Sequence, residues 1–259
     1  MKIYMIGIGG IGISALAQLY AAHGEDVSGS DREAGPTTEL LEKKGIKVII
    51  GQKAENVPSD AEAVVYTDAM PFDAPERVRA RELGIPEHSY FQALGEVSHG
   101  VATIAVTGTH GKTTTTAMLT KILVDAGKKP TAIIGSIVKD FGSNFVEGSP
   151  DLFVVEACEY KDHVLEIEPK ILVLTNVEWD HTDYFVTEAD MLRTFNVAAR
   201  KVPAGGAIVT NPALPNMRTV LDGVVASVID YSKEEVPELT LIGEFNAMNA
   251  RAAKAAALV

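Results

Sequence analysis

The fold of the first part of this chain is indicated most clearly by its N-terminal stretch, Ile3-Tyr4-Met5-Ile6-Gly7-Ile8-Gly9-Gly10-Ile11-Gly12. Its apolar start is typical of a buried strand, its glycines have the spacing G-x-G-x-x-G, and the segment Gly12–His23 has helical periodicity. Such glycines permit a tight turn, close approach of the backbone to a diphosphate, and close packing of the helix on the strand. We therefore expect a Rossmann-like domain with a diphosphate-containing ligand. The candidate binding residues are Gly9, Gly10, Ile11 and Gly12.

An acidic residue, Asp31, ends the next predicted strand, Val27–Asp31. A carboxylate at this position can accept a hydrogen bond from a ribose hydroxyl, so Asp31 joins the candidate ligand-binding residues. Taken alone, the loop and Asp31 indicate a nicotinamide-dependent dehydrogenase. The alternative is a glycine turn that serves packing only. The pattern leaves the identity of the diphosphate ligand open.

A second glycine-rich turn follows the predicted strand Thr103–Thr107 and opens the predicted helix Thr113–Ala126. Phosphate-binding loops wrap backbone N–H groups around phosphates, with a lysine on the β- and γ-phosphates and a hydroxyl on Mg²⁺. The usual spacing requires glycine at Val106, so this loop is a shortened variant. A lysine at a helix N-terminus is unfavourable unless an anion is bound there, and we predict a nucleoside triphosphate site. Its candidate residues are Gly108, Thr109, His110, Gly111, Lys112, Thr113 and Thr114.

Polar side chains also follow two later strands. One predicted strand, Leu152–Glu156, continues into Ala157-Cys158-Glu159, and another, Ile171–Thr175, continues into Asn176-Val177-Glu178-Trp179-Asp180-His181. The carboxyl ends of parallel strands lie at one edge of a sheet, where ligands bind. Mg²⁺ binds one or two carboxylates together with phosphate and water. The side chains expected near the second loop are Glu156, Asp180 and His181.

Strand-like runs alternate with helix-period segments along the whole chain, which is typical of α/β proteins with parallel sheets. The segment Ser98-His99-Gly100 separates two blocks, each of which opens with a strand and a glycine-rich turn. We therefore expect a Rossmann-like domain at residues 1–98 and a P-loop-type parallel α/β domain that binds a nucleoside triphosphate at residues 99–259.

Composition narrows the class of protein. The chain has 259 residues, of which 46% are hydrophobic and 22% charged, and this excludes a disordered chain. Its formal net charge of −12 argues against a nucleic-acid partner. The single cysteine, Cys158, excludes an internal disulfide, fits a reducing cytosol, and lies among carboxylates that would raise its pKa. No stretch approaches the ~20 apolar residues that span a bilayer, so we expect a cytoplasmic protein without a membrane partner.

Five motifs in this order resemble those of the Mur ligase family. They are Gly7–Gly12 with Ser28–Asp31, then Thr107–Thr116, Glu156–Glu159, Asn176–His181 and Gly243–Asn249. The resemblance implies that the first loop holds a UDP-sugar rather than NAD, and that the second holds ATP with Mg²⁺. It implies catalytic roles for Lys112, Glu156 and His181, and metal binding by Thr113, Glu156 and His181. It places Asn246 and Asn249 on the adenine side, and His110 where the family can touch the sugar substrate.

The resemblance also implies a reaction in which a muramate carboxylate attacks ATP and an amine opens the resulting acyl phosphate to an amide. The residues within these motifs are most similar to those of family members that join L-alanine to UDP-N-acetylmuramate. The alternatives are members that recycle a murein tripeptide onto the same nucleotide sugar, and a non-catalytic nucleotide-binding module. Two departures are Phe245, where histidine is more usual, and Cys158, where aspartate is commoner.

The family has a third domain that brings the amino-acid site, and this chain reaches Val259 about where that domain would begin. We therefore expect an engineered or natural fragment, or one part of a split gene, with a possible separate third domain. Such a chain should release little or no ADP when ATP, UDP-N-acetylmuramate and L-alanine are supplied together. A coupled assay for ADP checks this, and added third domain should restore the reaction. Full turnover by these 259 residues alone would contradict the expectation.

Overall fold

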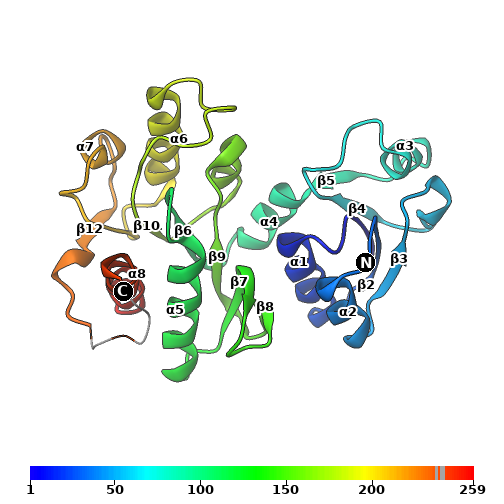
Figure 1. Cartoon of the computed structure of the whole chain (residues 1–259), viewed down its shortest axis with the longest axis horizontal. Helices are drawn as coiled ribbons and strands as arrows, with labels where there is room; N and C mark the ends of the chain where they lie inside the picture. The colour runs from blue at the N-terminus through cyan, green and yellow to red at the C-terminus, as the bar shows by residue number, and fades with distance from the viewer. Residues whose placement is uncertain (237–238, 240–242) are drawn as a thin grey trace. The chain divides into compact units, whose positions relative to one another are not determined.

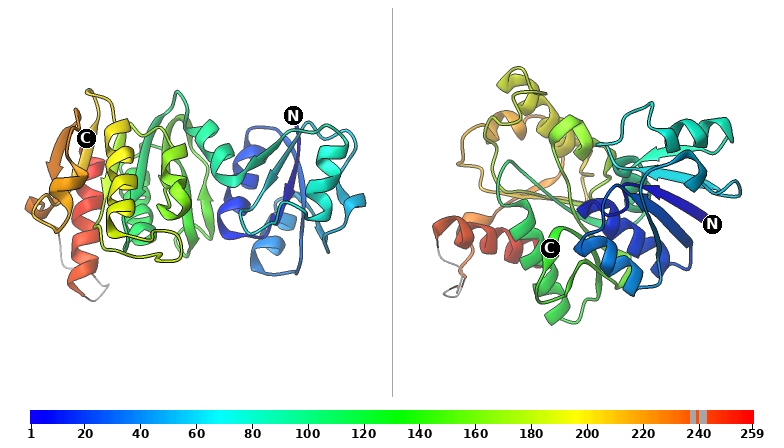
Figure 2. Two further views of the ribbon diagram at one scale, coloured as in Figure 1. Left: turned by 90° about the horizontal axis from the view of Figure 1, so that it is seen from above. Right: turned by 45° about the vertical axis from the view of Figure 1, so that its right-hand side comes forward.

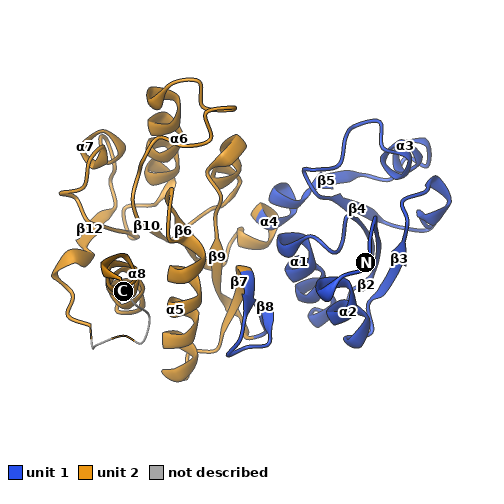
Figure 3. Ribbon diagram, viewed as in Figure 1, with its two compact units in different colours: residues 1–94, 136–147 blue, residues 95–135, 148–259 orange. Residues whose placement is uncertain are grey.

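The computed structural model describes residues 1–236, 239 and 243–259. The chain divides into two compact units: the first comprises residues 1–94 and 136–147, and the second residues 95–135 and 148–259 (Figure 3). The first unit therefore takes up a segment from the middle of the chain, which no local pattern in the sequence indicates. Both units contain parallel sheets, and the predicted α/β class is confirmed.

The first unit is built on a five-stranded sheet in the order β3-β2-β1-β4-β5, in which every neighbouring pair is parallel (Figure 1). Helices connect parallel strands because the chain must cross back before each new strand begins. The strands are β1 (Lys2–Ile6), β2 (Asp26–Asp31), β3 (Lys47–Ile50), β4 (Ala63–Tyr66) and β5 (Glu87–Ser89). The helices are α1 (Ile11–Ala22), α2 (Pro36–Lys43), the 3₁₀ turn η1 (Ala54–Asn56), α3 (Pro75–Glu82) and α4 (Tyr90–Ser98), of which residues 95–98 are counted with the second unit.

The second sheet has seven strands in the order β12-β11-β10-β6-β9-β7-β8. Its strands are β6 (Ala102–Thr107), β7 (Pro130–Val138), β8 (Ser143–Val146), β9 (Ser149–Glu156), β10 (Ile171–Leu174), β11 (Ala207–Thr210) and β12 (Ser227–Asp230). Its helices are α5 (Lys112–Asp125), η2 (Tyr160–Glu166), α6 (Glu188–Lys201), α7 (Met217–Val220), η3 (Tyr231–Lys233) and α8 (Glu244–Ala257). The strand β8 and residues 136–138 of β7 are those counted with the first unit.

Crossover direction sets the layers of the second unit. The chain moves one way along the sheet from β6 through α5, and the opposite way from β10 through α6, so right-handed crossovers place these helices on opposite faces. Figures 1 and 2 show α5 and α8 packed side by side on one face, with α6 and α7 on the other. The predicted helices and strands around both glycine loops are confirmed, with ends that differ by a few residues.

The elements that the sequence did not indicate are mostly short or lie at sheet edges: β5, β7, β8, β12, α4 and α7. The strands among them depend on pairing with a neighbouring strand rather than on a strong pattern of their own. Each helix in the described parts of the chain is too short or too polar to cross a membrane.

A buried carboxylate fixes the part of the first sheet that carries the glycine turn. Glu76 is 1% exposed and accepts hydrogen bonds from the hydroxyls of Tyr4 at 2.8 Å and Ser30 at 2.7 Å. The carbonyl oxygen of Ser30 in turn accepts hydrogen bonds from the amides of Gly7 at 2.8 Å and Ile8 at 2.9 Å. The α3 side chain thus holds β2, and β2 holds the start of the loop.

Gly29 in β2 provides a test of this close packing. A Cβ atom there would lie 2.2 Å from the carbonyl oxygen of Met5 and 2.9 Å from Cδ1 of Ile8. Gly29→Ala is expected to lower the free energy of unfolding by about 1–3 kcal/mol, since overpacking forces backbone shifts. Urea denaturation measures this. The control Gly205→Ala, where a Cβ atom meets nothing within 4 Å, should stay within about 0.5 kcal/mol of the parent; equal stability of all three proteins would contradict the argument.

Candidate nucleotide-binding sites

The second glycine loop lies between β6 and α5, as the sequence predicts. Its glycines Gly108 and Gly111 have φ values of +125° and +84°, in the region that favours glycine. A Cβ atom on Gly108 would lie 2.2 Å from Thr175 Oγ1, and one on Gly111 would lie 2.3 Å from Asn249 Oδ1. The loop therefore packs directly on the end of β10 and on α8, with no room for side chains at either position.

Asn176, directly after β10, fixes the backbone of the loop. Its Oδ1 accepts a hydrogen bond from the His110 amide at 2.9 Å, and its Nδ2 donates one to the His110 carbonyl oxygen at 2.9 Å. The hydroxyl of Thr109 donates to the carbonyl oxygen of Glu178 at 2.8 Å. The motif that begins at Asn176 thus forms one wall of the loop, a role that its sequence position after a parallel strand could have indicated.

Lys112 is paired with a carboxylate that sequence reasoning left out of the candidate set. Its Nζ lies 2.9 Å from Oε2 of Glu159 and donates to the carbonyl oxygen of Gly108 at 2.6 Å. Glu159 is 1% exposed, and its Oε1 lies 3.6 Å from Nε2 of His181. Glu159 therefore stands between Lys112 and His181. The available signal was its place in the motif after β9, three residues beyond Glu156.

Glu156 faces the first turn of α5. Its Oε1 accepts a hydrogen bond from the Thr113 hydroxyl at 2.9 Å, and its Oε2 accepts one from the Gly135 amide at 2.8 Å. A Cβ atom on Gly135 would lie 2.5 Å from the carboxylate, so β7 can reach Glu156 only with glycine there. Burial raises the pKa of Glu156 above its ordinary value, and the hydrogen bonds and the nearby Lys112 oppose that shift.

The donor set here suits a hard divalent cation. Thr113 and Glu156 offer a hydroxyl and a carboxylate on the side where phosphates would lie, and Mg²⁺ binds such oxygen donors with phosphate and water. A cation beside Glu156 would offset the burial that raises its pKa. Within residues 1–236, 239 and 243–259, three or more His, Cys, Asp or Glu side chains nowhere form a group that could hold a metal ion by themselves.

His181 has a left-handed backbone, with φ of 52°. Its amide donates to Oδ1 of Asp180 at 2.7 Å, a contact that stabilises the turn between these two residues. Strained backbone of this kind persists where the surroundings over-determine it and is enriched at functional sites. Burial, followed by the charge of Glu159, raises the pKa of the Cys158 thiol, which confirms the predicted direction and makes this thiol a poor nucleophile.

A cavity of about 450 Å³ lies beside the loop, a size suited to a small ligand. Asn249 and the exposed Phe245 of α8 line it, and Asn246 lies in the first turn of the same helix. Its complete lining is His110, Gly111, Thr175, Asn176, Glu178, Leu214, Tyr231, Phe245, Met248, Asn249 and Ala252. The structure thus brings Asn249 to the phosphate loop from the far end of the sequence.

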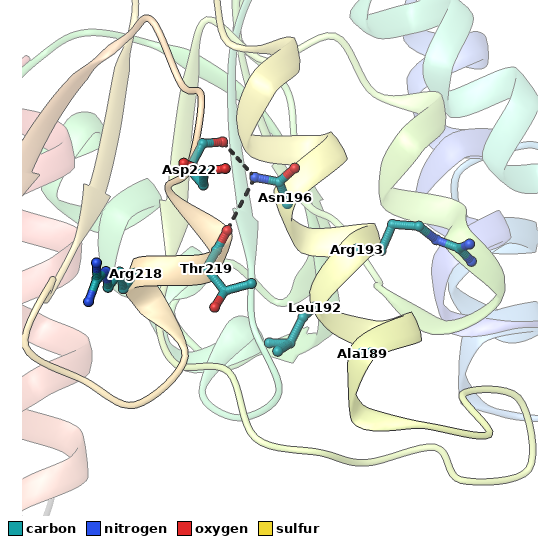
Figure 4. Close-up of a pocket in the computed structure, with 7 residues that line it drawn as sticks. All are labelled: Ala189, Leu192, Arg193, Asn196, Arg218, Thr219 and Asp222. Carbon is teal, nitrogen blue, oxygen red and sulfur yellow. Dashed lines mark hydrogen bonds between the residues drawn. The ribbon is translucent and has the colours of Figure 1, made fainter.

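A second cavity, of about 510 Å³, lies between α6 and α7 (Figure 4). Asn196 donates from Nδ2 to the carbonyl oxygens of Val220 at 2.9 Å and Asp222 at 2.8 Å, which fastens α7 and the following turn to α6. The side chains of Arg193 and Arg218 point away from each other in Figure 4. The cavity therefore has no converging charge that would select an anion.

In the first unit, the glycine loop closes on Asp31. The Gly9 amide donates to Oδ2 of Asp31 at 2.8 Å, and a Cβ atom on Gly9 would lie 2.8 Å from the same oxygen. The hydroxyl of Thr37 donates to the Gly9 carbonyl oxygen. A Cβ atom on Gly12 would lie 2.7 Å from the Tyr90 ring. The glycines thus serve close packing, and Asp31 lies against the amide that an anion would otherwise reach.

Two family models match this chain. The model described as the Mur ligase family, catalytic domain, matches residues 2–101, and the Mur ligase middle domain matches residues 106–238. The chain belongs to the Mur ligase family, whose N-terminal and middle regions it resembles throughout.

Similar proteins give more detail. The UDP-N-acetylmuramate–L-alanine ligase of Caldicellulosiruptor saccharolyticus is 42% identical over 89% of this chain and 51% of that protein. The ligase of the same name from Clostridium kluyveri is 39% identical over 90% and 51%. The chain thus spans about half the length of these curated relatives.

Solved structures agree with the family assignment. A UDP-N-acetylmuramate:L-alanyl-gamma-D-glutamyl-meso-diaminopimelate ligase from Neisseria meningitides has a TM-score of 0.88 and 29% identity, covering 99% of this chain and 93% of that one. The UDP-N-acetylmuramate–alanine ligase of Thermotoga maritima has a TM-score of 0.85 and 30% identity, covering 99% and 64%.

The raised pKa of Glu156 generates a pH-dependent prediction. The unfolded chain binds the Glu156 proton with a pKa near 4.5, whereas the folded chain binds it more tightly, so ionisation penalises the folded state as pH rises above 4.5. Glu156→Gln removes this penalty and can keep both hydrogen bonds. We expect the variant to be more stable than the parent at pH 7 and to lose that advantage as the pH approaches 4.5.

Thermal unfolding of both proteins between pH 4 and 8 measures the effect. Asp125→Asn is the matched control, because Asp125 is an exposed carboxylate on α5 that pairs with Lys121. A stability difference between Glu156→Gln and the parent that does not change with pH would contradict the assignment of the shift to Glu156.

Proposed function

We propose that this chain provides the UDP-sugar-binding and ATP-binding functions of a ligase that joins L-alanine to UDP-N-acetylmuramate in peptidoglycan synthesis. In that reaction a muramate carboxylate oxygen attacks the γ-phosphorus of ATP and ADP leaves. The amine of L-alanine then attacks the acyl carbon, and phosphate leaves as the amide forms and a proton is lost. The observation that carries the proposal is the loop between β6 and α5, with Lys112 and Thr113 facing Glu159 and Glu156.

Lys112 is the residue that would exchange partners when ATP binds. Its Nζ now lies against Glu159 and the carbonyl oxygens of Gly108 and Thr109, a set of acceptors that phosphate oxygens could replace. The phosphates would lie over the N-terminus of α5, where backbone amides and the helix dipole favour negative charge. Transfer of a phosphoryl group depends mainly on such positioning and neutralisation of charge.

Thr113, Glu156 and His181 would hold Mg²⁺ bound with ATP. The metal, when bound, neutralises charge on the β- and γ-phosphate oxygens. The Thr113 hydroxyl donates a hydrogen bond to Glu156 at 2.9 Å, so the two oxygen atoms are close enough to bind one metal ion. His181 would be a further ligand of the metal, and its Nε2 lies 3.6 Å from Oε1 of Glu159, whose Oε2 faces Lys112. Asn249, with Asn246 one turn earlier, would line the adenine side of the cavity beside Gly111.

In the first unit, the amides at the start of α1 would receive the diphosphate of the UDP-sugar. The residues are Gly9, Gly10, Ile11 and Gly12. Because Asp31 now accepts a hydrogen bond from the Gly9 amide, a diphosphate would displace that carboxylate and leave it available to a ribose hydroxyl. The same loop is compatible with NAD, but a dehydrogenase would give Lys112 and Thr113 no role.

A second candidate is a ligase that attaches a tripeptide to UDP-N-acetylmuramate. The TM-score of 0.88 with the Neisseria enzyme supports it. The identities of 42% and 39% with L-alanine ligases, against 29% with that enzyme, favour the first candidate.

Replacement of Lys112 tests the ATP site. Lys112→Ala is expected to weaken ATP binding by about 30-fold or more, the equivalent of a lost charge-assisted contact, and to leave UDP-N-acetylmuramate binding unchanged. Isothermal titration calorimetry with each ligand measures both. Lys121→Ala is the control, because Lys121 lies on the same helix and pairs with the exposed Asp125.

The variant leaves the buried Glu159 without its cation, which is destabilising in itself. The double variant Lys112→Met with Glu159→Gln removes both charges at similar volume and keeps the test valid if Lys112→Ala unfolds. Binding of NADH, or ATP binding that survives both variants, would contradict the proposal.

A further inference from the structure

The loops that follow β9 and β10 are joined by two reciprocal hydrogen bonds, one donated by each loop. Tyr160, after β9, donates from its hydroxyl to Oδ2 of Asp183 at 2.6 Å. Tyr184, after β10, donates from its hydroxyl to Oδ2 of Asp162 at 2.6 Å. Each loop thus supplies one phenol and one carboxylate. We refer to these four residues as the Tyr–Asp clasp.

The sheet order explains why long side chains are needed here. β9 and β10 are not neighbours, because β6 lies between them and carries the phosphate loop. Strands two positions apart are separated by about 10 Å, a distance that backbone hydrogen bonds between the strands themselves do not cover. The phenols of Tyr160 and Tyr184 cover that distance, and their rings meet edge to face with centroids 5.7 Å apart.

The clasp is also anchored to α6 and coincides with strained backbone. Asp162 accepts a second hydrogen bond, from the Thr194 hydroxyl of α6. Lys161, Asp162 and His181 have φ values of 54°, 61° and 52°, and they are three of the five residues other than glycine with positive φ in the described chain. Residues keep such conformations only when surrounding contacts hold them, and the clasp supplies those contacts on both loops.

The clasp lies directly against the proposed ATP–Mg²⁺ site. The Tyr160 ring contacts the His181 imidazole with centroids 4.8 Å apart. Tyr160 follows Glu159 in the chain, and Asp183 lies two residues after His181. The Tyr160–Asp183 hydrogen bond therefore fixes the distance between the loop that carries Glu159 and the loop that carries His181.

We propose that the Tyr–Asp clasp is a positioning device in which Tyr160 and Asp183 hold the His181 imidazole where it can reach a metal ion bound with ATP. This inference rests on the proposed function of the same site. Tyr160 and Asp183 act through His181 and are positioning residues. The hydrogen bond between Tyr184 and Asp162 stabilises the same two loops. We expect it to matter less, because the ring that contacts His181 is that of Tyr160.

Tyr160→Phe and Tyr184→Phe test the proposal, since each removes one hydroxyl and keeps the ring. The readout is ATP affinity by calorimetry, measured once with Mg²⁺ and once with EDTA. We expect Tyr160→Phe to reduce the Mg²⁺-dependent gain in affinity by about 3- to 10-fold, the loss of one net hydrogen bond, and to leave the affinity in EDTA unchanged. Tyr184→Phe should have a smaller effect in the same direction.

Electron paramagnetic resonance of Mn²⁺ with ATP gives a second readout, in which Tyr160→Phe should lower the fraction of bound Mn²⁺. Tyr66→Phe in β4 of the first unit is the control and should match the parent in both measurements. Double replacement, Tyr160→Phe with Asp183→Asn, should be no worse than Tyr160→Phe alone, because both changes remove the same bond.

The outcomes separate the two proposals. If the parent chain binds ATP with a Mg²⁺-dependent gain and Tyr160→Phe shows the same gain, the clasp has no positioning role and the proposed function stands. A parent chain without Mg²⁺-dependent ATP binding overturns the proposed function, and the role of the clasp with it. Equal losses with Mg²⁺ and with EDTA would show a general structural effect and would overturn the positioning role.

Discussion

The ion pair between Lys112 and Glu159 organises the second unit. It joins the loop after β6 to the loop after β9, and the parallel register of these two strands makes it possible, since Val106 lies opposite Glu156. The residues that follow Glu156 at the end of β9 therefore lie beside the glycine loop that follows β6. A buried carboxylate and a partly buried ammonium then stabilise each other, because either alone would carry a large desolvation penalty.

The same arrangement gives the charged groups beside the second glycine loop partners within the chain. Glu159 and two backbone carbonyl oxygens satisfy Lys112, and Thr113 and Gly135 satisfy Glu156. In the proposed function, phosphate and metal would exchange with these partners. The first loop uses a similar device, with the Asp31 carboxylate on the Gly9 amide. In both units, an acidic side chain lies beside a glycine turn.

The family assignment and this geometry support each other at the level of motifs. Both glycine loops, the acidic motif after β9 and the motif after β10 lie at strand ends that the predicted α/β class requires. The positions that depart from the family's usual residues are consistent with the packing. Cys158 is partly buried between carboxylates with a raised pKa, and Phe245 lines the cavity beside Gly111.

The elements whose signals are local could be predicted from the sequence. Glycine spacing, apolar strands and helix periodicity indicated both loops, and the motif order indicated the family. Contacts between distant residues could not be predicted in this way: Glu159 pairs with Lys112, the Gly135 amide donates to Glu156, Asn249 packs against Gly111, and the hydroxyls of Tyr160 and Tyr184 join two loops. The physical reason is that these partners lie far apart along the chain, and strand order and register, which no local pattern encodes, set their distances.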